Sequence, residues 1–369
     1  MTEMTVAVMG GGNASHAIAA DLTLKGLNVN LFEMPRFAEQ VKQVLEKQEI
    51  EVEGVSGEGT ASLGLATTDV REAVSGAKII FIPLPGFAVG PYAELLAPYL
   101  KAGQSVVIVP GTLGSLEFRW GIWQHGCRAR VVVGEMGGMP FAARVVAPGR
   151  VRIFHIRETL TLATIPGQDV PALHAKLESV YPCEPCSTVL EPGFGHLTPL
   201  LHPLGCLLNA GRIERSHGDF YMYEEGMTPS VVQVIEALDR ERLAIGQELG
   251  IDLPTGVQMM VESGYGPVGT LWETINGSAS LTALKGPGSL GSRYVTEDIP
   301  YGLVAWASVG NLVGVDTPIM DAAVEIGSAI MGKNCWLEGR NLDKMGLEGL
   351  NLEQVERYLT TGEHPGMEV

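Results

Sequence analysis

The sequence predicts an α/β protein in two parts, a doubly wound parallel sheet in the N-terminal half and an all-α domain in the C-terminal half. Two observations lead to this fold class. Short apolar runs alternate with helix-like segments up to about residue 190, and beyond that point strand signals become scarce while apolar helices follow one another. A chain of 369 residues is long enough for two domains, which we place at 1–188 and 189–369.

The expected strands of the first domain are short and apolar, as strands buried on both faces of a parallel sheet are. The first strand, "TVAVM", is rich in β-branched residues, and the helix that follows it stops at Gly26, a residue typical of a helix C-terminus. Helices between such strands cover the two faces of the sheet. The expected strands are 5–9, 28–33, 78–85, 104–111 and 129–135, and the expected helices are 15–26 and 36–48.

The second domain is predicted to be helical throughout. Its segments show apolar residues at helical spacing and few β-branched runs bounded by turns. The expected helices are 197–214, 230–250, 305–314 and 320–332. No internal repeat and no low-complexity segment interrupts this pattern.

Composition narrows the class of partner. Lys and Arg number 25 against 42 Asp and Glu, so the net charge of −17 would repel a phosphate-coated partner, and we expect no nucleic-acid binding. No apolar run reaches the roughly 18 residues that span a membrane, and the first residues lack the features of a signal peptide. We therefore expect a soluble cytoplasmic protein, either a monomer or a homodimer.

The cysteines give no sign of a disulfide framework or of a metal site. There are five, an odd number that is small for this length, which favours a reducing compartment. Cys183 and Cys186 form a single CxxC, with no second pair and no histidine at the spacing of a zinc site. We predict no metal.

A glycine-rich turn follows the first strand and opens the first helix, which makes the N-terminal domain Rossmann-like. Gly10-x-Gly12-x-x-Ser15 approximates the dinucleotide fingerprint, with Ser15 as a mild departure at the third position. Glu33 ends the second strand, 21 positions after Gly12, where a carboxylate can bind an adenosine ribose, so we favour NAD; Arg36 lies close by and leaves NADP possible. The residues we expect to bind the cofactor are Gly10, Gly12, Asn13, Ala14, Ser15 and Glu33.

In the second half, His202 stands out in the apolar segment "LLHPLGCLLNAG". A lone histidine there is often a core residue, but a carboxylate on one ring nitrogen would fix its tautomer and raise its basicity. The segment "GSRYVTEDIPYG" offers Glu297 and Asp298 for that role, in a loop or a loop-to-helix junction. It also offers Arg293, whose planar fork suits a substrate carboxylate, although a surface ion pair with Glu297 is the alternative.

Together these segments resemble the NAD/octopine dehydrogenase (opine dehydrogenase) family. "GGGNASHAIAADLTLKG", "LLHPLGCLLNAG" and "RYVTEDIPYGL" carry the resemblance, and "GEMGGMPFAARV" is similar to a further family segment. Members place an active site between a Rossmann domain and a helical domain. They reductively condense the amino group of an amino acid with a 2-oxo acid, often pyruvate, using NADH. The resemblance implies that His202 is the catalytic histidine, Asp298 its carboxylate partner and Arg293 the residue that binds the substrate carboxylate.

Two other functions remain open at this point. A 2-oxopantoate reductase or a glycerol-3-phosphate dehydrogenase would combine a similar front half with a helical back half, but such enzymes usually rely on a lysine of the helical domain. Between residues 177 and 332 this chain has only Lys285, in a glycine-rich segment. A non-catalytic NAD-binding sensor is the other alternative. The sequence leaves the amino acid unidentified; a basic one would need an extra carboxylate, for which Glu224, Glu225 and Glu262 are candidates.

Overall fold

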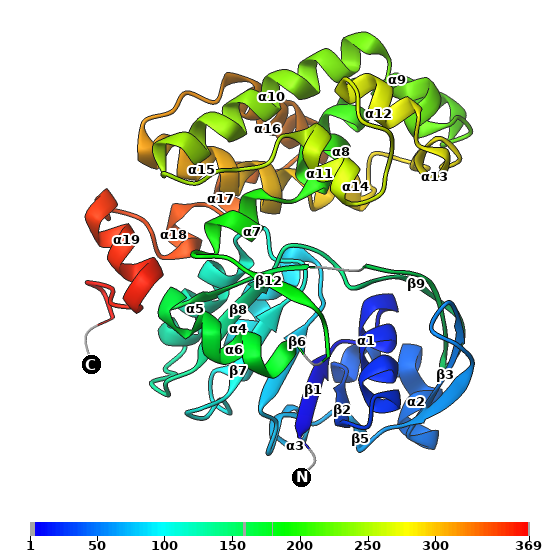
Figure 1. Ribbon diagram of the computed structural model, residues 1–369, viewed down its shortest axis with the longest axis vertical. Helices are drawn as coiled ribbons and strands as arrows, with labels where there is room; N and C mark the ends of the chain where they lie inside the picture. Colours follow the sequence, from blue (N-terminus) through cyan, green and yellow to red (C-terminus); the bar gives the residue numbers. More distant parts are fainter. Residues whose placement is uncertain (1–3, 158–159, 179, 368–369) are drawn as a thin grey trace. The chain divides into compact units, whose positions relative to one another are not determined.

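The computed structural model describes residues 4–157, 160–178 and 180–367, and the chain divides into two compact units (Figure 1). The first comprises Met1–Gly193 and Glu353–Val369, and the second comprises Phe194–Leu352. The sequence-based division differs from this at the C-terminal end, since it places 353–369 in the helical domain. The difference has a physical cause, because the ring of His364 lies 4.8 Å from that of Trp120, a residue of the first unit.

The main sheet of the first unit has eight strands in the order β12-β11-β8-β7-β6-β1-β2-β5. Across the sheet from β5 through β2, β1, β6 and β7 to β8, each strand runs parallel to its neighbour, as predicted. The next strand, β11, is antiparallel to β8. The bounds are β1 Thr5–Met9, β2 Asn28–Phe32, β5 Leu65–Thr67, β6 Ile79–Ile82, β7 Ser105–Ile108, β8 Val132–Met136, β11 Leu160–Ile165 and β12 Cys183–Pro185.

The strand order reverses at β1. The chain runs from β1 to β2 on one side and later returns to β6 on the other side of β1. In open α/β sheets, ligands bind at the carboxyl ends of the strands where the order reverses in this way. The turn after β1 therefore lies at the position that this topology assigns to a ligand.

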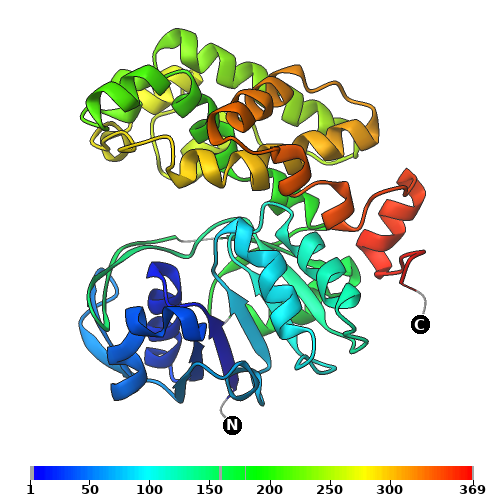
Figure 2. The same ribbon diagram turned by 180° about the vertical axis from the view of Figure 1, so that it is seen from behind.

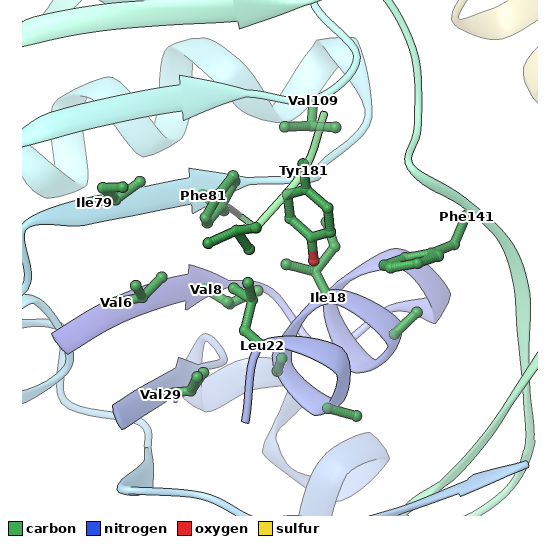
Figure 3. Packing of buried hydrophobic residues seen from close by; sticks show 14 of the residues in the cluster. Val6, Val8, Ile18, Leu22, Val29, Ile79, Phe81, Val109, Phe141 and Tyr181 are labelled. Atoms are coloured by element: carbon green, nitrogen blue, oxygen red, sulfur yellow. The ribbon is translucent and has the colours of Figure 1, made fainter. Parts of the chain in front are cut away.

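A buried core joins the sheet to helix α1 (Asn13–Leu24). Figure 3 shows Ile18 and Leu22 of α1 directed towards Val8 of β1. Tyr181 closes this core: its ring makes edge contacts with Phe81 and with Phe141, at centroid distances of 6.0 and 5.8 Å. This packing holds α1, and with it the glycine-rich turn, against the sheet.

A second, four-stranded sheet in the order β4-β3-β10-β9 was not predicted. Its strands alternate polar and apolar residues, as in "EIEVEG", where only the isoleucine and the valine are buried. A search for continuous apolar runs overlooks this period of two, which is typical of a sheet with one exposed face. The bounds are β3 Glu49–Gly54, β4 Gly59–Ser62, β9 Phe141–Ala147 and β10 Arg150–Ile156.

The remaining helices of the first unit are mostly short. The expected helix 36–48 is split into a 3-10 helix, η1 (Pro35–Val41), and an α-helix, α2 (Lys42–Lys47), because the backbone of Val41 departs from helical geometry with a φ of −116°. The others are α3 Val70–Val74, η2 Gly86–Ala88, α4 Val89–Leu96, α5 Gly114–Gln124, η3 Gly167–Asp169, α6 Val170–Leu177, α7 Leu190–Phe194 and, near the C-terminus, α19 Leu352–Thr361.

The second unit is helical, as predicted (Figure 2). Among its described residues, strand pairing is limited to one bridge between Tyr221 and Lys285. The expected helix 197–214 is two helices, with a break at Leu208–Asn209. The bounds are α8 Leu197–Leu207, α9 Ala210–Ser216, α10 Pro229–Glu248, α11 Gly256–Glu262, α12 Leu271–Asn276, α13 Ala279–Thr282, α14 Arg293–Thr296, α15 Val304–Val313, α16 Pro318–Met331, α17 Cys335–Glu338 and α18 Leu342–Met345, with π-helices η4 Met222–Gly226 and η5 Ile299–Leu303.

A buried ion pair stabilises the interior of the second unit. Arg242 on α10 is fully buried and donates to the carboxylate of Asp239 and to the carbonyl oxygens of Phe194 and Pro254. Burial lowers the pKa of Arg242, and the carboxylate of Asp239 opposes that fall. None of the helices within the described residues is long and apolar enough to cross a membrane.

Candidate active site

The turn after β1 has the geometry that a dinucleotide needs. Gly10 adopts a φ of +86°, a conformation that favours glycine, and a Cβ atom there would lie 2.4 Å from Leu84. At Gly12, in contrast, a Cβ atom would meet no atom within 4 Å, so the backbone faces open space just before the N-terminus of α1. An accessible backbone at a helix N-terminus suits a phosphate group. These residues fit an NAD-type cofactor.

Glu33 braces this turn from the end of β2. Its carboxylate accepts hydrogen bonds from the N–H of Gly11 at 2.7 Å and from the N–H of Met34 at 2.6 Å. Burial raises the pKa of Glu33, and the two backbone N–H groups and Arg36 oppose that rise. The guanidinium of Arg36 lies over the ring of Phe37. Glu33 therefore shapes the turn as well as standing where an adenosine ribose is expected.

The other expected cofactor residues differ in what their side chains do. Ser15 is fully buried and donates from its hydroxyl to the carbonyl of Met9 at 3.0 Å, so the departure from glycine at this position closes the turn. The side-chain oxygen of Asn13 accepts from the N–H of Val145 at 2.8 Å, which fastens β9 to the start of α1. We therefore expect Asn13 and Ala14 to bind a phosphate through their backbone N–H groups, which lie in the first turn of the helix.

In the second unit, the structure brings the expected histidine and carboxylate together. His202 lies on α8, and its Nδ1 is 2.8 Å from Oδ2 of Asp298, with each side chain 13% exposed. Because a carboxylate accepts but does not donate, Nδ1 carries the proton and Nε2 is left to face a reactant. Asp298 thus fixes the tautomer and the orientation of the ring.

Close backbone approach explains how Asp298 reaches His202. Asp298 directly precedes the π-helix η5, and Gly302 within η5 lies against α8, where an added Cβ atom would sit 2.7 Å from the ring of Pro199. A larger residue at position 302 would push η5 and α8 apart. Two π-helices, η4 and η5, flank this site, and such turns are frequent at functional sites.

The expected anion clamp, Arg293, directly precedes a tyrosine that contacts the histidine. The ring of Tyr294 stacks on the ring of His202, at 3.7 Å between centroids and 15° between planes. Arg293 is the preceding residue, and its Nε donates to the carboxylate of Glu297. This bond uses the Nε donor of the guanidinium, which carries five donors in all. The ion pair considered as the alternative role of Arg293 is therefore present.

Thr198 and Tyr223 complete the surroundings of the pair, and sequence reasoning missed both. Thr198 lies one helical turn before His202 and donates to Oδ1 of Asp298 at 3.0 Å. The hydroxyl of Tyr223, in η4, lies 3.2 Å from Nε2 of His202. A search for polar residues four positions from His202 would have found Thr198, whereas no sequence signal pointed to Tyr223.

The thiol of Cys206 lies near the carboxylate of Asp298, one helical turn after His202. Burial and the charge of Asp298 raise the pKa of Cys206 to about 12. The thiol is therefore protonated at neutral pH and unsuited to act as a nucleophile.

Two other residues considered from the sequence, Glu225 and Lys285, are held in ion pairs. Glu225, considered for a basic amino acid, pairs with Arg212. Lys285 lies 2.9 Å from Asp219 and its side chain is half exposed. A lysine that serves as the proton donor of a ketone reductase would have to leave that pair.

Comparisons with known proteins agree with this arrangement. The model of the NAD/NADP octopine/nopaline dehydrogenase α-helical domain matches residues 185–331. The model of the NAD-dependent glycerol-3-phosphate dehydrogenase N-terminus matches residues 5–113. The first match covers the segment that contains His202 and Asp298, and the second covers the glycine-rich turn.

Whole-chain similarities cover both units. An opine dehydrogenase of Arthrobacter sp. (strain 1C) is 35% identical over 94% of this chain and 96% of its own length. A structure of octopine dehydrogenase in complex with NADH and agmatine has a TM-score of 0.79 at 21% identity, covering 98% of this chain and 99% of the other. A structure of yersinopine dehydrogenase with bound NADP+ has a TM-score of 0.77 at 15% identity and covers 97% and 99% of the two chains.

Proposed function

This chain belongs to the opine dehydrogenase family, and on that premise we propose that it joins the amino group of an amino acid to the carbonyl carbon of pyruvate. It is an NAD-dependent dehydrogenase that acts on a CH–NH bond, by reductive condensation through an imine. The identity of the 2-oxo acid and the roles of single residues are our proposal.

We assign cofactor binding to the turn after β1. Gly12 gives the pyrophosphate access to the backbone, and the N–H groups of Asn13 and Ala14 hold it at the start of α1. Glu33 binds the adenosine ribose and favours NADH over NADPH, because a 2′-phosphate would meet its carboxylate. When bound, NADH supplies the hydride that reduces the imine carbon.

We assign proton transfer to His202. As the amine attacks the carbonyl carbon, the carbonyl oxygen takes up charge, and the protonated ring donates from Nε2 to that oxygen. Asp298 holds Nδ1–H and stabilises the charged ring before this step. The attacking nitrogen then returns one of its two protons to the neutral ring at Nε2, and the ring passes that proton to the new hydroxyl, which leaves as water. The nitrogen keeps its other proton in the protonated imine, and addition of hydride to the imine carbon gives the secondary amine.

We assign binding and orientation of the substrate carboxylate to Arg293. The donors of its terminal nitrogens match the two oxygens of a carboxylate, and a bidentate pair of that kind fixes both position and direction. Its neighbour in sequence, Tyr294, stacks on the ring of His202, which supports this assignment. The 2-oxo acid would then present its carbonyl, one bond from its carboxylate, to the proton donor.

The observation that carries this proposal is the 2.8 Å contact between Nδ1 of His202 and Oδ2 of Asp298. These residues lie 96 positions apart in the sequence and come from different elements of the second unit. A histidine that served only as a core residue would be satisfied by a backbone carbonyl, whereas a carboxylate partner is the one that supports proton transfer.

The test is NADH oxidation with pyruvate, measured with and without a pooled mixture of amino acids. Oxidation that depends on the amino acids supports reductive condensation, and fractionating the pool then identifies the amine. Oxidation at the same rate without them contradicts the proposal and supports a 2-oxo acid reductase instead. Repeating the assay with NADPH tests the cofactor preference assigned to Glu33.

We also propose that the protein acts in the cytoplasm as a monomer or a homodimer. All five cysteines are free in the structure, which suits a reducing compartment. Fractionation of cells that express the protein, followed by sedimentation of the purified chain, checks both statements.

A further inference from the structure

The hydroxyl of Tyr223 faces the same ring nitrogen that the proposed function gives to the substrate. Nδ1 of His202 is committed to Asp298, and the Tyr223 oxygen lies 3.2 Å from Nε2. The side chain of Tyr223 is 4% exposed, so water has little access to this contact. A substrate oxygen that reaches Nε2 must therefore come close to this hydroxyl.

The state of Tyr223 makes it a hydrogen-bond donor. Burial raises the pKa of Tyr223 well above its ordinary value, with further contributions from Tyr294, Cys206 and Asp298. The phenol therefore keeps its proton throughout the neutral and mildly alkaline range. Its anion would be a poor general base here, but its neutral form can donate.

The protonation state of the His202 ring decides whether the Tyr223 hydroxyl can donate to a substrate. With a neutral ring, Nδ1–H donates to Asp298, and the lone pair of Nε2 accepts from the Tyr223 hydroxyl. Once Nε2 is protonated it has no lone pair, and the hydroxyl can no longer donate to it. When Nε2 of His202 is protonated, the Tyr223 hydroxyl can therefore donate its hydrogen bond to another acceptor.

We propose that Tyr223 is a second catalytic donor, whose hydroxyl binds the carbonyl oxygen of the 2-oxo acid beside His202. Two donors 3.2 Å apart can both reach an oxygen that lies about 3 Å from each. Charge grows on this oxygen as the amine attacks, so the second hydrogen bond strengthens in the transition state. Such donors act chiefly on kcat. The inference rests on the proposed role of His202.

Glycine and helix geometry support this placement. Tyr223 lies in the π-helix η4, and η4 reaches α8 where Gly205 faces the side chains of Met222 and Met227. Asn209 at the end of α8 donates from its amide nitrogen to the carbonyl of Gly226, the last residue of η4. The element that bears the hydroxyl is therefore fastened to the helix that bears His202.

The experiment compares Tyr223→Phe with Tyr358→Phe under saturating NADH, pyruvate and the active amino acid. Phenylalanine keeps the buried ring and removes only the hydroxyl, so we expect kcat of Tyr223→Phe to fall by roughly 100-fold. The KM for pyruvate should change by less than about threefold, because the lost bond matters most in the transition state. Tyr358 is a buried tyrosine of the first unit whose hydroxyl has no hydrogen-bond partner among the described residues, and its variant should keep wild-type kcat.

Two outcomes overturn the inference. A kcat for Tyr223→Phe within threefold of wild type would mean that the hydroxyl only shields Nε2. A kcat above wild type would mean that it competes with the substrate for that nitrogen. Thermal unfolding and NADH titration of the same samples show whether the variant is folded.

A parallel assay of His202→Ala separates this inference from the function on which it rests. Loss of turnover in His202→Ala with normal turnover in Tyr223→Phe rejects the role of Tyr223 alone. Normal turnover in His202→Ala rejects the assignment of the proton donor, and with it the inference. A pH profile of kcat for Tyr223→Phe should keep the shape of the wild-type profile at a lower level, since the phenol donates without ionising.

Discussion

Each unit of the chain holds a histidine on a helix and a carboxylate at its candidate site, and the partners of these residues differ between the two units. In the first unit, His16 lies 3.0 Å from the carbonyl oxygen of Gly12, and Glu33 accepts from the N–H groups of Gly11 and Met34. In the second unit, His202 and Asp298 contact each other.

This difference in partners explains the difference in expected roles. Backbone partners hold His16 and Glu33 as parts of a turn, and burial lowers the pKa of His16, so its ring stays neutral. A neutral histidine without a carboxylate has no means to store a proton. His202 differs in this respect, because a carboxylate, that of Asp298, lies against its Nδ1. The residue types alone would not separate the two histidines, but their partners do.

The largest predicted effect comes from breaking the pair in the second unit. Asp298→Asn replaces the acceptor on Nδ1 with an amide that can impose the wrong tautomer, so kcat should fall by about 10²- to 10⁴-fold. Steady-state kinetics measure the loss, and NADH binding should be unchanged. Asp219→Asn is the matched control, since Asp219 is an exposed carboxylate of the same unit paired with Lys285. A kcat within threefold of wild type in Asp298→Asn would contradict the comparison.

A smaller effect is predicted from the turn of the first unit. Gly12→Ala places a Cβ atom where no protein atom lies within 4 Å, so the chain should fold normally. The same methyl group obstructs the approach of a pyrophosphate, and NADH affinity should fall by about tenfold or more, or about 1.4 kcal/mol. Fluorescence titration with NADH measures the affinity, and thermal unfolding without the cofactor measures the stability. Gly211→Ala in α9, also in open space, should bind NADH as wild type does; equal affinities in both variants would reject the phosphate site.

Thr198 offers a graded test of the pair. Thr198→Val keeps the shape of the side chain but removes the hydroxyl that donates to Asp298, so the carboxylate is held less firmly. We expect kcat to fall by about fivefold, which corresponds to roughly 1 kcal/mol for one hydrogen bond. Thr198→Ser should restore most of the activity, because it returns the hydroxyl. A serine variant as slow as the valine variant would show that packing, and not the hydrogen bond, matters at this position.

The last prediction concerns stability and not turnover, through the pH dependence of unfolding of the first unit. Burial lowers the pKa of His16 in the folded chain, so below about pH 6.5 the unfolded chain binds a proton that the folded chain does not. Stability contributed in this way is present above that pH and is lost as the pH falls. His16→Asn cannot titrate, so between pH 7.5 and 5.5 it should lose up to about 1.4 kcal/mol less than wild type in urea unfolding. His125→Asn, at an exposed histidine, should follow wild type, and equal losses in all three proteins would contradict the prediction.

Much of the fold could be predicted because its signals are local. The strand at 5–9 and the helices of the second unit follow from runs and spacings within a few residues of one another. The second sheet could not be found in this way, because β3 pairs with β10 across about 100 residues and neither strand is continuously apolar. The return of α19 to the first unit depends on contacts with rings such as Trp120, which no local pattern encodes.

In the candidate site, too, the residues with a local sequence signal could be predicted and the others could not. His202, Arg293 and Asp298 drew attention because charged or titratable residues are unusual in such segments and match a family motif. Tyr223 and Tyr294 carry no such signal, since tyrosine is common in cores and their approach to His202 depends on how η4 and α14 pack against α8. Tertiary packing therefore decides which neighbours a recognised residue acquires.

The central claim is that the second unit performs proton transfer while the first unit binds the cofactor, and His202→Ala tests it most directly. One preparation of this variant would be measured twice, for kcat with pyruvate and the active amino acid and for the NADH dissociation constant by fluorescence. We predict that kcat falls by at least about 10²-fold while the dissociation constant stays within twofold of wild type. A loss of NADH affinity that matches the loss of turnover, or turnover near the wild-type level, would contradict the account.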